Sequence, residues 1–365
     1  MKTSNNKIIF HVVQHLAPGG LESLVLDFMT FAQPGTEVYV VSIEGTKHQA
    51  IANWPKLAAH KDNLVFLNKA PGFQGHVYHD LVRLFRAMKV DVVHTHHIGP
   101  LLYGGTAAKH AKVPVRLHTE HDVWHLSKRK SQLMQSMLLK HVQPQLVADA
   151  FRVGEQLDKL FQYPKLSCIP NGIDVSRFKP GSKVSARLDF AIDAHDIVIG
   201  SAGRLESVKG HDVLIKAMRY VPSHIKLVIA GDGSQREELT KLITKLHLED
   251  RVRLLGRVDN MARFYQALDV FCLPSRHEGY PLTALEAQAC GIHTVVTDVG
   301  SSSETLCPHT GALVKPNRII ALALGLEQKA AGLNQQSPRD HVVANNDIRH
   351  MVAQYDVLAR EGEAA

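Results

Sequence analysis

Short apolar runs alternate with longer segments of helical spacing along nearly the whole chain. The runs are rich in Val and Ile, as strands buried on both faces are. In the first part of the sequence they lie at residues 8–13, 37–43, 64–67, 90–94, 113–118 and 145–148. Helical patterns lie between them, for example at residues 20–31 and 78–88. This alternation predicts βαβ units and a parallel sheet covered by helices on both faces.

The alternation restarts after a break that contains Pro170, Gly172 and Pro180. The second set of strands is expected at residues 197–202, 226–230, 252–255, 270–273 and 294–297. We therefore predict an α/β protein with two parallel-sheet domains of similar size that face each other across a cleft, where the carboxyl ends of the strands place the binding loops. The expected domains are residues 1–175 and 176–340, followed by a helical tail at 341–365. The stretch 178–196 is expected to connect them.

The composition is that of a folded protein that needs no disulfide bonds or structural metal. Of its 365 residues, 45% are apolar and 21% are charged, so sizeable cores are expected and disorder or a fibrous repeat is excluded. The four cysteines form no CxxC pair, which favours free thiols in a reducing compartment. The N-terminal apolar run is too short for a signal peptide, and no run reaches a membrane-spanning length. We expect a cytoplasmic location.

The charge balance favours anionic partners. The formal net charge is +7, and 23 histidines add positive charge below neutral pH. Nucleic acid, nucleotide phosphates and an anionic bilayer all fit this charge, as does a merely solubilising surface. Aromatic residues make up only 6% of the chain, and no basic stretch is interleaved with them. Binding to nucleic acid is therefore not expected.

The segment 269–304 is the most informative part of the sequence. A strand ends at Pro274, a polar loop carries Glu278 and Gly279, and Pro281 opens a helix that Gly291 closes. Glu278 and Glu286 both lie near the positive end of this helix, whose free amides suit an anionic ligand. Glu286 would then accept hydrogen bonds from ligand hydroxyls. The alternative is N-capping and dipole pairing by surface glutamates.

A second segment, 199–214, carries two cations after a predicted strand. Gly203 and Arg204 are followed five residues later by Lys209 and Gly210. Arginine binds phosphate oxygens in a bidentate manner and lysine adds a point charge, so the pair fits a diphosphate. A solvated surface pair is the alternative. Glycine turns that would let the backbone approach a ligand also follow other strands, at Gly19, Gly20, Gly231 and Gly233.

Histidines gather in the first half of the chain, at positions 94, 96, 97, 118, 121 and 125. They complete no recognised zinc pattern, and no DxD pair is present to hold Mg²⁺, so we expect no metal. His121 is the member best placed for chemistry, because it follows a predicted strand and is flanked by Glu120 and Asp122. His94, His96 and His97 are expected to pack or cap where a strand leaves its sheet.

Together these residues resemble the retaining glycosyltransferases of family 4, also called glycosyl transferases group 1, which have the GT-B fold of two Rossmann-like domains. Five elements match in the family's order between residues 8 and 305. They are the pair Gly19 and Gly20, the T-x-HD-like element at 119–122, NG-[IV]-D at 171–174, GR-x4-KG at 203–210, and E-x7-E at 278–286. The resemblance implies that the tail from Asp347 packs back onto the N-terminal domain.

The resemblance also implies a role for each matched residue. Arg204 and Lys209 would neutralise the diphosphate of a nucleotide sugar, and Glu286 would bind the ribose hydroxyls. Glu278 would hold hydroxyls of the donor sugar, and His121 would contact that sugar near the reacting carbon, so these two form the implied catalytic pair. The rest of the implied donor-binding set is Gly19, Gly20, Val258 beside the nucleobase, Gly279 and Thr283.

The chemistry implied is transfer of a sugar from a diphosphate leaving group. Fixed cations and helix amides stabilise the charge that builds up on the departing diphosphate, so neither metal nor cofactor is expected. The family retains the anomeric configuration, by front-face attack or through a glutamate nucleophile, and both remain open. Ser302 and Ser303 stand where the family often has glycine, His293 replaces a common proline, and Tyr280 with Pro281 replaces phenylalanine and glycine. The serines put the shape of the loop before Glu304 in question.

The leading hypothesis is transfer of a hexose or N-acetylhexosamine to a lipid-linked or oligosaccharide acceptor in bacterial surface polysaccharide assembly. A basic first domain, with Lys128, Arg129 and Lys130, would contact an anionic membrane at its periphery. The alternatives are a nucleotide-sugar-binding partner subunit without transfer activity, and sugar-nucleotide epimerisation or phosphorolysis on the same fold.

Overall fold

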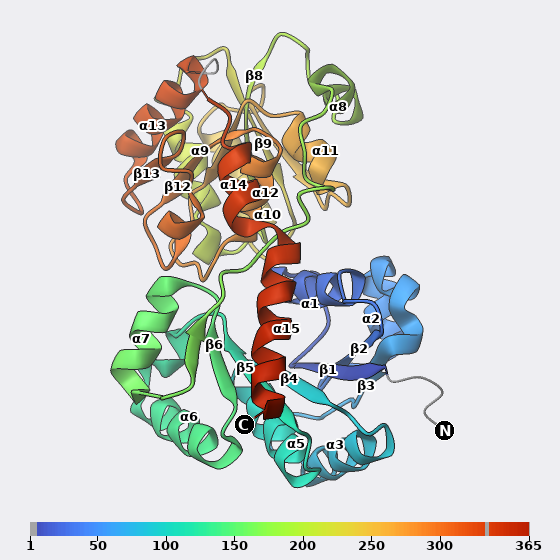
Figure 1. The fold of residues 1–365 in the computed structure, drawn as a ribbon. Coiled ribbons are helices and arrows are strands. Elements are labelled where there is room, and N and C mark those ends of the chain that lie inside the picture. The colour runs from blue at the N-terminus through green and yellow to red at the C-terminus, as the bar shows by residue number, and fades with distance from the viewer. Residues whose placement is uncertain (1–5, 333–335, 365) are drawn as a thin grey trace. The chain divides into compact units, whose positions relative to one another are not determined.

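The computed structural model describes residues 6–332 and 336–364, which form two compact units (Figure 1). Unit 1 comprises the chain up to residue 171 and again from residue 348, and unit 2 comprises residues 172–347. The expected boundaries at 175/176 and 340/341 are therefore displaced. Asn171 N donates to Asp149 O in unit 1, whereas Ile173 N donates to Asn346 O and Ile173 pairs with Asp347 in unit 2.

Unit 1 contains a seven-stranded parallel sheet in the order β3-β2-β1-β4-β5-β6-β7. Its strands are β1 (Lys7–Val13), β2 (Thr36–Ser42), β3 (Leu64–Phe66), β4 (Val92–His96), β5 (Val115–Glu120), β6 (Gln145–Ala148) and β7 (Leu166–Cys168). Its helices are α1 (Gly20–Thr30), α2 (Lys47–Asn53), α3 (Gly75–Ala87), α4 (Ile98–Pro100), α5 (Thr106–His110), α6 (Arg129–Val142), α7 (Phe151–Phe161) and α15 (Ile348–Ala364).

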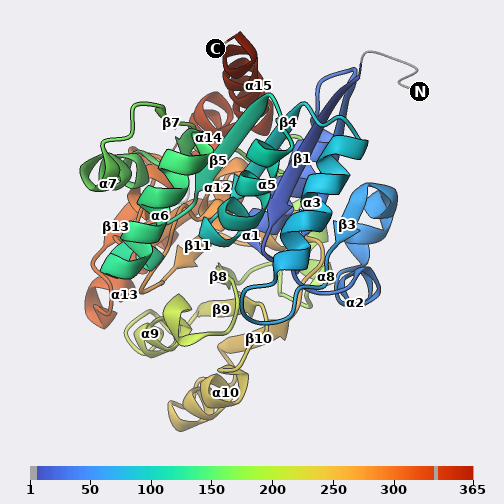
Figure 2. The ribbon, with the colours of Figure 1, turned by 90° about the horizontal axis from the view of Figure 1, so that it is seen from below.

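Each face of the unit 1 sheet carries its own apolar cluster. Phe10 and Val12 point to the side covered by α3 and α5 (Figure 2), where they pack with Val77 and Leu81. On the opposite face, α1 and the C-terminal helix α15 pack against β4, β5 and β6 (Figure 1). The tail helix is therefore a structural part of unit 1, because Met351, Val352, Tyr355 and Leu358 are buried in this cluster.

Unit 2 contains a six-stranded parallel sheet in the order β10-β9-β8-β11-β12-β13. Its strands are β8 (Ile197–Ala202), β9 (Ile225–Ala230), β10 (Val252–Gly256), β11 (Val270–Leu273), β12 (His293–Thr297) and β13 (Ala312–Val314). Its helices are α8 (Lys183–Asp189), α9 (His211–Ala217), α10 (Arg236–Lys245), α11 (Met261–Gln266), α12 (Leu282–Ala289), α13 (Ile319–Ala331) and α14 (Arg339–Asn346). The segment expected to be a connector thus contains α8.

The strand order of each sheet reverses at one point. In unit 1 the reversal lies between β1 and β4, and in unit 2 it lies between β8 and β11. The loops that leave two such neighbouring strands diverge to opposite sides, and the crevice at their start is where open α/β sheets bind ligands. In unit 2 these loops are the two segments that carry the cations and the glutamates.

Among the described residues, no helix is both long and apolar enough to cross a bilayer.

Candidate functional site

Lys209 and Glu278 form an ion pair beside the strand reversal of unit 2. Lys209 lies at the end of a short turn after β8, and Glu278 lies in the loop after β11. Lys209 Nζ donates to Glu278 Oε1 at 2.7 Å, and Ser275 Oγ donates to the same oxygen at 2.6 Å. The glutamate side chain is 8% exposed and the lysine side chain is 23% exposed. Two residues from separate motifs therefore meet, and both retain a route to solvent.

Gly210 allows the two loops to approach this closely. Its φ is 67°, and a Cβ at this position would collide with the carbonyl oxygen of Pro274. Gly231, with φ of 142°, likewise lies against the carbonyl oxygen of Gly203. These glycines allow close contacts between the loops after β8, β9 and β11.

Arg204 follows the same strand as Lys209 and is exposed. The side chain of Lys209 would lie about 3.7 Å from a Cβ placed on the neighbouring Gly203. Arg204 and Lys209 thus occupy one loop at the carboxyl edge of β8. This loop therefore carries two cations beside the strand reversal, and both residue types bind phosphate oxygens.

Glu286 lies inside helix α12, half-buried, and Tyr265 of α11 holds it in place. Tyr265 OH donates to Glu286 Oε2 at 2.7 Å. The tyrosine is fully buried, and this burial together with the neighbouring Glu286 charge raises its pKa well above the ordinary value. Tyr265 therefore remains a neutral donor that fixes one carboxylate oxygen.

The other residues implied as donor ligands in unit 2 lie on loops and on a helix start. Val258 follows β10 and lines a groove with Arg257 and Asn260. Gly279 lies between Glu278 and the start of α12, and its carbonyl accepts from Ser301 N. Thr283 is the second residue of α12. All three lie beyond the carboxyl ends of strands, as expected of binding loops.

Ser302, one of the two serines that depart from the family pattern, closes the loop that contains it. Ser302 Oγ donates within this loop, 2.7 Å from Val299 O, and accepts from Val299 N at 3.2 Å. Ser302 is fully buried, and its backbone needs no positive φ. The loop before Glu304 is therefore closed by a hydroxyl. Tyr280, another departure, accepts a hydrogen bond from Asn346 at 2.7 Å.

In unit 1, Gly19 caps the N-terminus of α1 and Gly20 is its first residue. The backbone of Gly19 is extended, and a Cβ there would collide with the carboxylate of Glu22. That carboxylate is also 3.3 Å from His15 Nε2. The glycine pair thus stands at a helix N-terminus directly after β1, as predicted, but with a glutamate side chain beside it.

His121 is the end of a line of hydrogen-bonded side chains that runs across unit 1. Its Nδ1 is 3.0 Å from Asp149 Oδ2, and its Nε2 is 3.0 Å from His96 Nδ1. His96 Nε2 in turn is 3.1 Å from His11 Nδ1. Asn171 Nδ2, from the NG-[IV]-D element, donates to Asp149 Oδ2 at 2.7 Å. Both ring nitrogens of His121 are therefore engaged within the protein.

Burial sets the charge of this line of side chains. It lowers the pKa of His11 to about 3 and holds the pKa values of His94 and His96 well below the ordinary value. Burial also raises the pKa of Asp149, against the hydrogen bond from His121. With Asp149 ionised, each imidazole in the line donates toward the carboxylate, which fixes the tautomer of His121 with its proton on Nδ1.

A second group of histidines surrounds the carboxylate of Glu120. This side chain is fully buried, and His118 Nε2 and Gln135 Nε2 lie 2.9 and 2.8 Å from its Oε1. His97 and His125 lie 3.6 and 3.7 Å from its Oε2. Burial alone would raise the pKa of Glu120, but the hydrogen bonds and charges of His118 and His97 hold it well below the ordinary value.

Three of the buried histidines are close enough together to raise the question of a metal. Ring nitrogens of His11, His94 and His96 all lie within 4.8 Å of one another. Each ring is already hydrogen-bonded, since His11 pairs with His96, His96 also pairs with His121, and His94 Nε2 is 2.7 Å from Thr119 Oγ1. This arrangement is a hydrogen-bonded core of neutral imidazoles, in which His11 from the first strand had no signal in the sequence.

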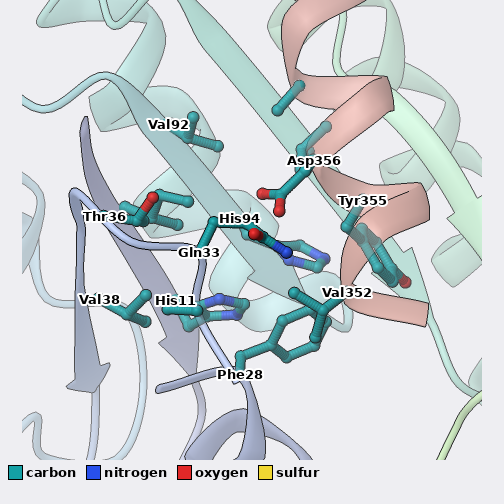
Figure 3. Close-up of a pocket in the computed structure, with 14 residues that line it drawn as sticks. His11, Phe28, Gln33, Thr36, Val38, Val92, His94, Val352, Tyr355 and Asp356 are labelled. Carbon is teal, nitrogen blue, oxygen red and sulfur yellow. The ribbon is translucent and has the colours of Figure 1, made fainter. Parts of the chain in front are cut away.

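Beside this core, between the sheet and helices α1 and α15, lies a cavity of about 30 Å³ (Figure 3). His11 and His94 form its floor, and Phe28, Tyr355 and Asp356 line it from the helices. The phenol of Tyr355 is 3.0 Å from Thr119 Oγ1, which links α15 to the same network. A volume of this size holds roughly one water molecule, so the cavity is not a site for a nucleotide sugar.

Three supporting residues escaped the sequence analysis. Tyr265 orients Glu286, Ser275 supports Glu278, and Asp149 orients His121. Asp149 directly follows β6, so its position at the carboxyl end of a strand was a usable signal. Tyr265 lies inside helix α11 and belongs to no motif, so it gave none.

Comparison with known proteins matches both halves of the chain. The family model described as Glycosyltransferase Family 4 matches residues 18–177, and the model described as Glycosyl transferases group 1 matches residues 185–337. A D-inositol 3-phosphate glycosyltransferase of Actinosynnema mirum is 30% identical over 278 residues, which are 66% of this chain and 66% of that protein.

A UDP-Gal:alpha-D-GlcNAc-diphosphoundecaprenol alpha-1,3-galactosyltransferase of Escherichia coli is 29% identical over 289 residues, 73% of this chain and 74% of that protein. Some other curated relatives are matched over less of their length, for example 56% of the protein from Xylanimonas cellulosilytica. Among solved structures, HepE of Anabaena in complex with UDP superposes with a TM-score of 0.84 at 20% identity, covering 97% of this chain and 100% of that one. The chain belongs to the GT-B glycosyltransferases of family 4, glycosyl transferases group 1.

Proposed function

We propose that the protein transfers a hexose or N-acetylhexosamine from a nucleoside-diphosphate sugar to a lipid-linked or oligosaccharide acceptor, with retention of configuration. The observation that carries this proposal is the meeting of Lys209 and Glu278 at the strand reversal of unit 2. One supplies a cation for the leaving diphosphate, and the other supplies a carboxylate for sugar hydroxyls. A nucleotide-sugar-binding subunit without transfer activity would use the same two groups, so transfer to an acceptor is the measurement that separates the two hypotheses.

Catalysis follows from where charge develops. Breaking the bond between the anomeric carbon and the phosphate oxygen places negative charge on the diphosphate. Arg204 and Lys209 stabilise that charge more strongly in the transition state than in the ground state. Lys209 reaches the diphosphate by exchanging all or part of its bond to Glu278, whose freed oxygen then accepts from the sugar. The donor therefore replaces an internal ion pair with two bonds of its own.

His121 acts through the face and edge of its ring, because Asp149 and His96 occupy both of its nitrogens. In this proposal it shapes the site of the donor sugar and takes no proton. The departing phosphate then deprotonates the acceptor hydroxyl in a front-face reaction. A glutamate nucleophile would instead have to be Glu278 Oε2, because Lys209 and Ser275 both donate to Oε1.

The names of the relatives guide the choice of substrates for the test. One relative acts on a sugar diphosphoundecaprenol with UDP-Gal, and the complex of Anabaena HepE contains UDP. These names support a uridine donor and a lipid-linked acceptor as the first pair to try. D-inositol 3-phosphate, from the name of the Actinosynnema protein, is the soluble acceptor for comparison.

The decisive experiment first screens thermal stabilisation by UDP, GDP and their sugars, because a bound ligand stabilises the folded state by mass action. Transfer from the radiolabelled donor is then measured with membrane lipid as acceptor, with EDTA present to test the expected independence of metal. Product analysis without acceptor separates transfer from epimerisation and phosphorolysis. Unchanged transfer by a K209A/E286A double variant would overturn the proposal.

A further inference from the structure

The outer face of helix α6 in unit 1 carries apolar side chains that the core does not use. Leu133, Met134 and Met137 are 62%, 37% and 56% exposed. Their spacing of three and four residues places them on one side of the helix. The inner side is already filled, since Leu138, Leu139 and Val142 are buried. The exposed stripe is therefore additional to what folding requires.

Cations flank this stripe at both ends. Lys128, Arg129 and Lys130 lie at the start of α6 and Lys140 lies in its last turn, and all four are exposed. Residues 123–148 contain no aspartate or glutamate. No residue in the described ranges 6–332 and 336–364 forms an ion pair with any of these four cations.

The position of the basic cluster is costly for the helix itself. Cations at a helix N-terminus oppose the helix dipole and destabilise it. Lys128, Arg129 and Lys130 therefore do not serve the stability of α6, and an external anionic partner accounts for them better. An array of cations without acidic neighbours is complementary to a surface that carries many negative charges.

An exposed aromatic residue precedes α6. Trp124 lies in the short 3-10 turn at Trp124–Ser127, which packs against α6, and its side chain is 49% exposed. Tryptophan, with an apolar ring and a polar NH, favours the boundary between lipid headgroups and acyl chains. Figure 2 shows α6 in the layer of α5 and α3, on the sheet face that α15 does not cover.

We propose that the outer face of α6 docks onto an anionic lipid bilayer. Leu133, Met134, Met137 and Trp124 enter the boundary between headgroups and acyl chains, while Lys128, Arg129, Lys130 and Lys140 lie over anionic headgroups. One part of this inference rests on the proposed function: that this surface brings the enzyme to a lipid-linked acceptor. Lipid binding itself is measured without donor or acceptor, so either proposal can fail alone.

The test uses the full chain and vesicles of phosphatidylcholine, with or without phosphatidylglycerol. We expect binding to the anionic vesicles alone, and weaker binding as salt is added. Each cation near such a surface strengthens binding about fivefold, so R129Q/K130Q should bind roughly 25-fold more weakly. The matched control K89Q/K112Q removes the same charge from exposed turns elsewhere in unit 1 and should bind as the wild type does.

The contribution of the apolar stripe is tested with the variant L133S/M137S. The control is I320S/L324S on α13, whose two replaced side chains are similarly exposed. Only the α6 variant should lose binding, by at least about tenfold. In a Trp54→Phe background, Trp124 is the single tryptophan, and its emission should shift to the blue on anionic vesicles. Absence of binding by the wild type would overturn the proposal, as would equal losses in both controls. So would a wild-type dimer that L133S/M137S converts to monomers, because the stripe would then be a protein interface.

Discussion

Replacing Lys209 by methionine separates the contribution of the Lys209–Glu278 ion pair to stability from the contribution of Lys209 to catalysis. The substitution removes the ammonium and keeps an apolar stem of similar length. Glu278, whose side chain is 8% exposed, is left with Ser275 as its donor. Breaking a fully buried ion pair costs about 3–5 kcal/mol, but Lys209 is 23% exposed and solvent screens the pair, so we expect unit 2 to lose about 2 kcal/mol.

The partner variant Glu278→Gln leaves a lysine that can reach water, and we expect it to cost about 1 kcal/mol. The double variant K209M/E278Q has no uncompensated charge. It should therefore lose about 1.5 kcal/mol instead of the additive 3, which is a coupling of about 1.5 kcal/mol between the two sites. Hydrogen exchange of the β8 and β11 amides measures these values in unit 2 alone.

The double variant should regain part of the stability but none of the catalytic activity. A charge-assisted hydrogen bond to phosphate contributes about 1.5–3 kcal/mol, so K209M should lose about 10- to 150-fold in kcat/KM for the donor, and the double variant should lose at least as much. Transfer from a radiolabelled nucleotide sugar provides the measurement. If K209M/E278Q matched the activity of E278Q alone, Lys209 would be only a structural partner of Glu278, and the assignment to the diphosphate would be wrong.

Four further variants probe other parts of the structure. Gly210→Ala should cost unit 2 at least about 2 kcal/mol, because its φ is 67° and its Cβ would strike a backbone carbonyl. Gly45→Ala, with φ of 77° and open space around it, should cost about 1 kcal/mol, and equal losses in hydrogen exchange would contradict the steric argument. Tyr265→Phe should raise the donor KM about tenfold by releasing Glu286, as expected for one hydrogen bond; an unchanged KM would leave the hydroxyl only a packing role. The buried His11 has a pKa of about 3 in the folded protein. As the pH falls below the ordinary pKa of histidine, His11 therefore binds a proton in the unfolded chain but not in the folded one, and unit 1 is destabilised. The wild type should lose free energy of unfolding between about pH 7.5 and 5.5, and His11→Gln should remove up to about 1.4 kcal/mol of that loss. Urea unfolding followed by tryptophan emission measures the free energy at each pH. If the dependence of this free energy on pH were the same in the variant and the wild type, the assignment of the loss to His11 would be refuted.

Strand patterns in the sequence predict the elements that are buried on both faces. The central strands, such as β1, β8 and β11, are continuous apolar runs because helices cover both sides of each sheet. The edge strands β7 and β13 have three residues each and are only partly buried, so no run marks them. Helix α8 is short, and its Leu188 is 76% exposed, which hid it in the expected connector.

The motifs locate the candidate site more reliably than they describe its contacts. They place Lys209 and Glu278 after strands, and the strand order then brings these strands side by side. Spacing along the chain does not show that the two residues bind each other, because that contact depends on a glycine that lets the loops touch. The same holds for His121, whose partners Asp149 and His96 come from loops and strands on either side of β5.

The pairing of β1, β4 and β5 determines the line of histidines. His11 and His94 are register partners, and His96 is the register partner of Thr119. A shift of two residues in either pairing would separate these rings. The sequence shows many histidines but not this register, so the hydrogen-bonded core could be found only in the folded chain.

The division of unit 1 between the two ends of the chain has a consequence for synthesis on the ribosome. Helix α15 covers an apolar face of β4, β5 and β6, yet its codons are translated after all those of unit 2. Unit 2 can complete its sheet and helices while unit 1 still waits for its last helix. The nascent N-terminal sheet therefore keeps an uncovered apolar surface until residues 348–364 have been translated, and it is during this interval that chaperone protection matters.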